Sequence, residues 1–389
     1  MRPLFLLLTL VPGLIADTAT DGGGPEPQDS GGARAQDLPP PSDRPPGPDD
    51  PARQAIERGL AWLARDLSTS ATGASHTGDP AHAAPVGVTA LCALAYMAGG
   101  TSPGRGPHQR ALERQLDYLL SLVVPEGEED AGYVHATGDT QSRMHGHGLA
   151  VLAFTQAFAL SPRSQRGQRL ARAIELGVRR IELAQGRDGG WYYEPQPWEL
   201  TEGSVTVCLL WALRGARNAG FEVDRAVVDR AMEYVRSLQE ENGGFIYAPH
   251  EPRSSVALTG ACLSTLHALG VYEGREIDDA YDYVWRELAR RDTARSEGLA
   301  GRASPFPYYE RWYLAQALWQ HRDPRVFRRW FAEERNRILR EQRPDGSWAD
   351  ARYDAGGARI EGRYGTAYAT AMNVLVLSVP EGLLPAFQR

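Results

Sequence analysis

Three stretches of this chain decide its fold: Gln185-Gly-Arg-Asp-Gly-Gly-Trp191, Gln239-Glu-Glu-Asn-Gly-Gly-Phe245 and Gln342-Arg-Pro-Asp-Gly-Ser-Trp348. In each stretch a glycine follows the glutamine by four residues, and a large aromatic residue follows it by six. Each stretch lies between two apolar segments with helical spacing. Because one such unit cannot bury its own apolar face, neighbouring units must pack together, and the repeat predicts a stacked architecture.

The spacing of these motifs predicts six units. Phe245 follows Trp191 by 54 residues and Trp348 follows Phe245 by 103, so we place one degenerate unit between the last two motifs, at residues 291–307. Counting back from Trp191 by about one repeat length locates a degenerate copy of the motif at Gly132-Tyr133. One repeat length further back lies the Gly/Ser/Thr-rich loop 68–78, which we take as another degenerate copy.

Each unit has the pattern helix, turn, helix. The first helix carries a one-sided apolar stripe, such as Leu170, Ile174, Val178 and Ile181, and is therefore amphipathic. The second is apolar all round, which indicates protein on every side. We expect outer helices near 52–66, 109–122, 170–184, 224–239, 278–290 and 326–342, and inner helices near 86–97, 148–160, 205–213, 256–269, 312–319 and 364–377. This pattern predicts an all-α protein, an (α/α)6 toroid.

The two ends of the chain differ from each other. Residues 1–16 hold one Arg and an apolar run too short to span a bilayer, which is typical of an export signal. Residues 17–50 are rich in Pro, Gly and Asp and predict a disordered tether. Residues 51–389 form the single predicted toroid domain. We therefore expect a periplasmic or extracellular protein without a transmembrane segment.

Charge and cysteine content narrow the choice of partners. Of the net charge of -7, residues 17–50 contribute -6 and Arg2 contributes +1, which leaves -2 for the repeats. This balance predicts no nucleic-acid partner.

Cys92, Cys208 and Cys262 lie in different inner-helix segments and are expected to be buried without disulfides. We expect a monomer whose partner is a small molecule, a glycan or a protein.

The repeated motif itself is interpreted as structural. Asp188-Gly-Gly and Asn242-Gly-Gly suit a tight turn, because Asp and Asn bond their own backbone and Gly accepts a positive φ. The glutamine amide can satisfy backbone groups at the turn, and the aromatic ring can cover it.

These residues carry a family resemblance. Gln-x-x-x-Gly-x-Trp at Gln185, Gln239 and Gln342 resembles the QW motif of squalene and oxidosqualene cyclases. The units resemble the prenyltransferase/squalene-oxidase repeat of the terpenoid cyclase and protein prenyltransferase superfamily, over residues 51–389. The resemblance implies an α/α toroid whose ligands enter a central cavity. The segments 364–372 and 384–389 are similar to the ending of exported bacterial members.

The activity motifs of that family do not carry over residue by residue. The nearest match to the Asp-x-Asp-Asp acid of class II cyclases is Glu276-Ile-Asp278-Asp279, and residues 278–282 also fit the Asp-Asp-x-x-Asp magnesium motif of class I synthases. These acids open a predicted outer helix, whose dipole favours carboxylates there. We cannot place the zinc-binding Asp, Cys and His of protein prenyltransferases, and the thioester motif of complement-type toroids is absent.

Histidines gather in the loops before the first two inner helices, at His76, His82, His135, His145 and His147 together with Asp79 and Asp139. We take His82, His135, His145 and His147 as candidate ligands of a divalent metal, and His145 also as a candidate general acid or base. The alternative is an ordinary polar rim, since His145 and His147 do not share a helix face. The cofactor therefore stays unknown.

A second cluster combines acids with aromatic residues. Glu202 and Glu310 are the candidate catalytic carboxylates of a carbohydrate hydrolase or lyase. The candidate ligand-binding residues around them are Trp198, Tyr309, Arg311, Trp312, Tyr364 and Tyr368. The structural alternative is that the aromatic rings pack, that Glu310 and Arg311 form a surface ion pair, and that Glu202 favours the start of an inner helix.

Two functions remain open at this point. The first is an exported repeat protein that binds a ligand or a protein through its cavity and rim, without proven catalysis. The second is an enzyme that uses the toroid cavity, either a terpenoid or polyprenyl cyclase relative or a polysaccharide lyase or hydrolase. Fold does not decide between them. A groove with Glu202 facing Glu310 would favour sugar chemistry, and a dry aromatic funnel would favour terpenoids.

Overall fold

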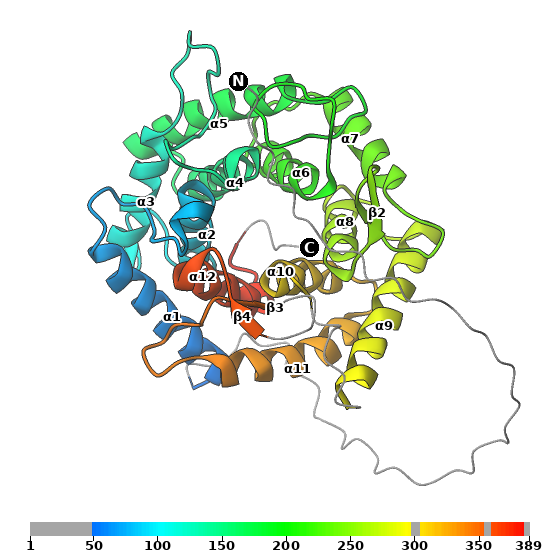
Figure 1. Cartoon of the computed structure of the whole chain (residues 1–389). Coiled ribbons are helices and arrows are strands. Elements are labelled where there is room, and N and C mark those ends of the chain that lie inside the picture. The colour runs from blue at the N-terminus through cyan, green and yellow to red at the C-terminus, as the bar shows by residue number, and fades with distance from the viewer. Residues whose placement is uncertain (1–48, 297–303, 354–358, 385–389) are drawn as a thin grey trace, which may run out of the picture. The chain divides into compact units, whose positions relative to one another are not determined.

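Helices alternate between two concentric layers in the computed structural model, which describes residues 49–296, 304–353 and 359–384, all within one compact unit (Figure 1). The outer layer holds α1 (Pro51–Ser68), α3 (Gln109–Ser121), α5 (Gln165–Leu183), α7 (Arg225–Ser237), α9 (Arg275–Ser296) and α11 (Pro324–Glu341). The inner layer holds α2 (Pro85–Ala98), α4 (Arg143–Leu160), α6 (Gly203–Asn218), α8 (Val256–Ala268), α10 (Pro307–Trp319) and α12 (Gly365–Ser378).

The inner layer closes on itself. Each inner helix contacts the next one along the chain, and α12 contacts both α10 and α2. In the outer layer α1 contacts α11, so the first and last outer helices also meet. The predicted all-α toroid with inner and outer helices is therefore confirmed.

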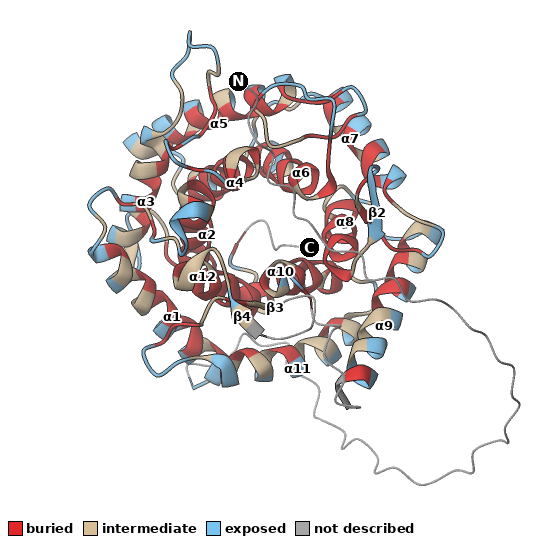
Figure 2. Cartoon of the chain, in the orientation of Figure 1, coloured by how far each residue is buried: buried red, intermediate tan, exposed pale blue. Residues whose placement is uncertain are grey.

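The inner helices are buried on all sides and the outer helices on one side only, as their apolar patterns predict (Figure 2). Every residue of α2 from Val86 to Ala98 is buried, because protein surrounds this helix. In the outer helix α3 the buried residues are Leu112, Gln115, Leu116 and Leu119, a single stripe at helical spacing. Cys92, Cys208 and Cys262 are buried and free, as expected.

Two inner helices begin five residues earlier than predicted. The helix α4 starts at Arg143 and not at Gly148, because Gly146 and Gly148 serve close packing and not a turn. A Cβ on Gly148 would lie 2.9 Å from the Leu209 side chain. The helix α10 starts at Pro307 and not at Trp312, with proline in the first turn, where its missing N–H costs nothing.

The connections from outer to inner helices are long, such as 184–202, whereas those from inner to outer helices are short, such as 161–164. Two of the long connections contain antiparallel hairpins that the all-α prediction did not include. One pairs β1 (Ile246–Ala248) with β2 (Glu251–Ser254), and the other pairs β3 (Ala351–Tyr353) with β4 (Arg359–Glu361). Two short 3₁₀ helices, Pro80–His82 and Val379–Glu381, complete the described elements.

The glutamine of each motif joins its own turn to the next outer helix. The Gln185 amide donates to the carbonyls of Gly189 and Val227, both at 2.8 Å. The other two repeat this geometry, since Gln239 bonds Gly243 at 3.1 Å and Glu276 at 2.8 Å, and Gln342 bonds Gly346 and Ala55 at 2.9 Å. Because Ala55 belongs to α1, the last motif closes the ring. The structural interpretation of the motif is confirmed.

A glycine with positive φ lies in each of these turns and also in the two degenerate copies of the motif, at 132–133 and in the loop 68–78. A Cβ on any of them would meet a backbone carbonyl of the next outer helix, and these pairs are Gly73 with Arg114, Gly132 with Leu176, Gly189 with Arg230, Gly243 with Asp279 and Gly346 with Arg58. Glycine is therefore required both by the backbone conformation and by the close approach of the two segments. Of the predicted degenerate turn in 291–307, residues 297–303 lie outside the described residues, and 291–296 are the last residues of α9.

The export signal predicted over 1–16 and nearly all of the tether predicted over 17–50 lie outside the described residues. Asp50 caps α1 by accepting from the Ala52 N–H at 2.7 Å, and its carboxylate pairs with Arg335 at 2.6 Å. This residue therefore links the start of α1 to α11.

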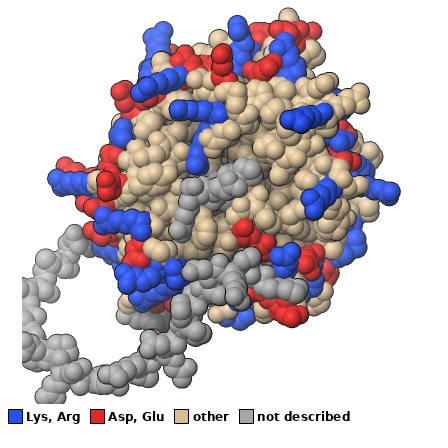
Figure 3. Space-filling model, turned by 180° about the vertical axis from the view of Figure 1, so that it is seen from behind, with Lys and Arg blue, Asp and Glu red and all other residues tan. Residues whose placement is uncertain are grey.

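Acidic and arginine side chains are interspersed around the face seen in Figure 3, without a continuous field of one sign. This distribution agrees with the small net charge of the repeats. None of the described helices is both long enough and apolar enough to cross a membrane.

We expect Gly243→Ala to lower the free energy of unfolding by about 3 kcal/mol or more, since a strained φ costs roughly 1–3 kcal/mol before any clash with the Asp279 carbonyl is added. The matched control is Gly220→Ala, whose φ is also positive but whose added Cβ would meet nothing within 4 Å. It should cost about 1 kcal/mol. Urea titration and scanning calorimetry of both variants measure the difference, and equal losses would contradict this account of the turn.

Candidate functional site

The N-termini of the inner helices meet at one end of the ring. The inner helices run parallel to one another, because each follows an outer helix that runs the opposite way, and their N-termini adjoin the long connections (Figure 1). An outer helix lies behind each inner helix and other inner helices lie beside it. Residues near these N-termini that keep some exposure therefore face the ring axis or its rim, and they include His145, Ser204, Tyr309 and Tyr368.

Glu202 lies at this end, at the base of the connection between α5 and α6. Its backbone pairs with Trp191, the aromatic residue of the motif, through a 2.9 Å hydrogen bond. Its carboxylate is fully buried and caps α6, accepting from the Ser204 and Val205 N–H groups at 2.7 and 2.6 Å and from the Ser204 hydroxyl at 3.0 Å. Burial raises the pKa of Glu202 to about 7 despite these hydrogen bonds.

Two tyrosines extend the Glu202 cluster. Tyr247 lies beside Glu202 and Tyr193, and Tyr193 also lies beside Ser204. Burial, followed by the nearby Glu202 carboxylate, raises the pKa of both phenols far above the ordinary value. Each phenol is therefore neutral at physiological pH and can both donate and accept a hydrogen bond.

An aromatic wall from α10 and α12 faces this cluster. The rings of Tyr309 and Tyr313 lie 4.6 Å apart, and Tyr368 packs against Tyr364 at 5.2 Å. Burial is the main cause that raises the pKa of Tyr309, and the Glu202 carboxylate contributes, which places the two residues near each other. The Tyr309 hydroxyl and the Trp312 indole N–H are buried and have no hydrogen-bond partner in the described part of the protein.

Trp198 lies at the rim of the same connection. It is 40% exposed, and its ring stacks on Tyr192 with centroids 6.3 Å apart and an interplanar angle of 10°. The pair presents a flat aromatic surface to solvent. The candidate ligand-binding residues Trp198, Tyr309, Trp312, Tyr364 and Tyr368 are therefore all found at one end of the ring.

The predicted roles of Glu310 and Arg311 need correction. They are buried and do not form a surface ion pair with each other. Glu310 pairs with Arg291 of α9 at 2.5 and 3.2 Å, whereas Arg311 bonds Glu334 of α11 at 2.5 Å and Asn373 at 2.7 Å. Both side chains tie α10 to neighbouring helices, because a buried charge is stable only when it is paired. Glu310 therefore does not face Glu202 as a second catalytic carboxylate.

The histidines are dispersed over separate local contacts. His147 is inside α4, where its Nδ1 accepts from the Val134 N–H at 3.1 Å and its Nε2 bonds the Gly177 carbonyl at 3.2 Å. His145 is also in α4, and burial lowers the pKa of both to about 4. His82 pairs with Asp79, and His135 is exposed and stacks on Tyr133.

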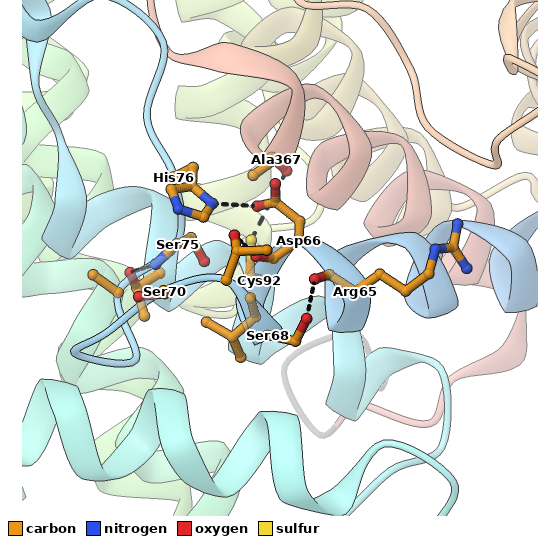
Figure 4. Close-up of polar contacts among 12 residues, drawn as sticks. Arg65, Asp66, Ser68, Ser70, Ser75, His76, Cys92 and Ala367 are labelled. Atoms are coloured by element: carbon orange, nitrogen blue, oxygen red, sulfur yellow. Dashed lines mark hydrogen bonds and ion pairs between the residues drawn. The ribbon is translucent and has the colours of Figure 1, made fainter.

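This arrangement does not fit a shared metal ion. Among the described residues, no three His, Cys, Asp or Glu side chains are grouped to hold one. Figure 4 shows the histidine of the first loop, His76, directed at Asp66 of α1 at 3.1 Å, with the buried Cys92 thiol beside them. Burial raises the pKa of Cys92 to about 12, so this thiol is not a nucleophile or a ready metal ligand.

Sequence reasoning missed Tyr193 and Tyr247. Each follows the aromatic residue of its motif by two positions, Trp191 and Phe245 respectively, and the equivalent position in the last motif is Asp350. Asp350 caps α12 by accepting from the Tyr364 and Gly365 N–H groups, both at 2.8 Å. Aligning the motifs in register would therefore have located three residues at this end of the ring.

The acids 276–282 do open an outer helix, α9, as expected.

Known structures share this fold at low sequence identity. A type II terpene cyclase from Scytonema matches with a TM-score of 0.55 and 15% identity, covering 87% of this chain and 98% of that one. A GH76A α-1,6-mannanase from Salegentibacter sp. has a TM-score of 0.58 and 11% identity over 85% and 99% of the two chains. The cellobiose 2-epimerase of Spirochaeta thermophila has a TM-score of 0.57 and 14% identity over 86% and 98%.

The chain thus has the α/α-toroid fold found in a terpene cyclase and in enzymes that act on sugars. No protein-family model matches the sequence. No curated protein matches it either. The fold is therefore shown by structure alone.

Glu202 should make stability fall with rising pH. Its folded-state pKa of about 7 exceeds its ordinary value of 4.5, so the stability that its proton adds is fully present below pH 4.5 and is lost as the pH rises through 7. The unfolding free energy of wild type relative to Glu202→Gln should drop by about 2–3 kcal/mol between pH 5 and 8. Urea titrations at each pH measure it. Glu199→Gln, an exposed neighbour, should show no such trend, and a flat difference for Glu202→Gln would exclude the shift.

His147→Ala should lower the free energy of unfolding by about 2–4 kcal/mol, because it leaves the Val134 N–H and the Gly177 carbonyl unpaired and opens a cavity. His135→Ala, at an exposed ring, should cost less than about 1 kcal/mol. A chelator should change neither result. Stoichiometric metal in elemental analysis, lost together with stability in either variant, would restore the metal hypothesis.

Proposed function

We propose that this toroid binds a carbohydrate at the tyrosine-rich end of its ring. The observation that carries the proposal is the convergence of half-buried phenols, including Tyr193, Tyr247, Tyr309 and Tyr368, around the inner-helix N-termini. Phenols of raised pKa stay protonated and match the mixed donors and acceptors of sugar hydroxyls, while their faces can pack against sugar C–H groups. This proposal develops the binding function predicted for the cavity and rim.

Unpaired polar atoms favour a sugar over a polyprenyl chain. The Tyr309 hydroxyl and the Trp312 N–H are buried without partners among the residues that the structure describes, and a hydrocarbon ligand would leave them so, at a cost of about 1–3 kcal/mol each. A hydroxylated ligand would pair them. The exposed Trp198–Tyr192 stack extends the same kind of surface to the rim. The mannanase and the epimerase that share the fold are named for sugar substrates, which supports the same choice.

Catalysis by Glu202 is the second candidate function. A carboxyl group with a pKa of about 7 can transfer a proton near neutral pH. In this structure both of its oxygens accept hydrogen bonds from the first residues of α6, and Glu310 is paired elsewhere. Binding is therefore the better supported function, and hydrolysis by a pair of carboxylates is not favoured.

Calorimetric titration with α-1,6-mannotriose and cellobiose tests the proposal on the full chain. We expect saturable binding to at least one sugar, weakened about five- to tenfold by Trp198→Ala through the loss of about 1 kcal/mol of stacking. Tyr309→Phe, which removes only the hydroxyl, should weaken it by a similar factor. Tyr272→Ala is the matched control, because Tyr272 is exposed beyond the C-terminus of α8, at the opposite end of the ring.

The outcomes separate the candidates. Binding of geranylgeraniol but of neither sugar would replace the carbohydrate with a terpenoid. Sugar turnover that Glu202→Gln abolishes while binding persists would establish catalysis. Absence of binding to all of these probes, or equal loss in Tyr272→Ala, would overturn the proposal.

A further inference from the structure

A separate cavity lies between α4 and α6, toward their C-termini. Its lining includes Leu152, Gln156 and Ala159 from α4, and Trp211, Arg214 and Gly215 from α6. Its volume is about 30 Å³, more than the roughly 10–15 Å³ that one water molecule requires. Ten residues of α6 separate Arg214 from Ser204, about 15 Å along the helix. The cavity is therefore distinct from the tyrosine-rich end.

Two hydrogen-bond donors in this cavity have no acceptor. The Trp211 side chain is 4% exposed, and its indole N–H makes no hydrogen bond with the described residues. The same holds for Nη1 of Arg214, whose guanidinium lies over the Trp211 ring at 5.3 Å from its centroid. Buried donors are nearly always paired, so two together indicate that a partner molecule supplies the acceptors.

The charge of Arg214 is also uncompensated. Within the described part of the chain it forms no ion pair, and the cavity lining contains no Asp or Glu. Arg214 is half-buried, and this burial lowers its pKa. By contrast, the buried Arg180 bonds the carbonyls of Ala131, Glu129 and Pro195. An arginine left without a counter-ion points to an anionic ligand.

We propose that this cavity binds the carboxylate of a small organic acid. One carboxylate oxygen accepts from Nη1 of Arg214 and the other from the Trp211 indole. The apolar part of the lining, which includes Leu152, Ala159 and Ala219, takes a short alkyl group, and the polar residues Thr155, Gln156 and Asn218 complete the lining. A planar carboxylate matches the planar guanidinium better than a tetrahedral anion does, and the small volume restricts the ligand to a few carbon atoms.

Titration of the full chain with sodium acetate and propionate tests this site, with acetamide as the uncharged isostere of acetate. The signal is the indole ¹H–¹⁵N resonance of Trp211, assigned by its absence in Trp211→Phe. We expect saturation with a dissociation constant on the order of 1–10 mM for so small a ligand. Acetamide and hexanoate should bind at least tenfold more weakly, the first because it lacks charge and the second because it exceeds the cavity.

Arg214→Met should abolish the shift, whereas Arg217→Met, an exposed arginine three residues further along α6, should keep it. Should Arg214→Met fail to fold, Trp211→Phe followed by thermal shift should still show at least threefold weaker acetate binding. Equal binding of acetate and acetamide, an unchanged shift in Arg214→Met, or no saturation up to 100 mM acetate would each overturn the proposal. None of these results depends on sugar binding at the other end.

Discussion

The toroid depends on one interaction, the bridge that a glutamine amide makes between its own turn and the next outer helix. The Gln185, Gln239 and Gln342 amides each donate to one carbonyl of the turn and to one carbonyl in the first residues of the following outer helix. Each carbonyl oxygen has two lone pairs, so the carbonyl in the outer helix can accept the glutamine amide in addition to its bond within the helix. The adjacent glycine allows the contact, because any Cβ there would strike the same outer helix. Since Gln342 reaches α1, this bridge also turns a stack of units into a closed ring.

The same turn positions the candidate site. The backbone of Trp191 holds Glu202 at the start of α6, and the residue two positions after each aromatic lies at the inner-helix N-termini, where Tyr193, Tyr247 and Asp350 are found. The motif glutamines and glycines are occupied by structural contacts and recur in all three full copies. The residues beside the motif differ between copies. The repeated contacts therefore hold the ring together, while the side chains at the inner-helix N-termini vary from unit to unit. Polar groups gather there because the N-termini of six parallel helices need acceptors.

The fold could be predicted from the sequence because its signals are local. Helical periodicity separated outer from inner helices, and motif spacing gave their order. The site was predicted less well. The starts of inner helices placed Tyr309 and Tyr368 at this end of the ring, and Trp198 lies in the connection before α6; their role in ligand binding stays a prediction. Glu310 was assigned to catalysis and Arg311 to ligand binding, whereas both are paired with outer helices. His145 and His147 were placed in the loop before an inner helix, whereas both lie in α4, where Gly146 and Gly148 serve helix packing.

The sequence by itself determined that this chain forms a two-layered helical ring and which faces are buried, since periodicity, turn glycines and the clasping glutamine act over a few residues. The tertiary structure decided which polar groups are paired and which are left free. Glu202 and Glu310 are the same residue type at the start of inner helices. One has a raised pKa among tyrosines and the other is neutralised by Arg291. Likewise Arg180 is satisfied and Arg214 is not. The desolvation and the pairing of these charged side chains depend on residues that are distant in the sequence and become neighbours only in the folded ring. A local sequence pattern therefore does not predict them.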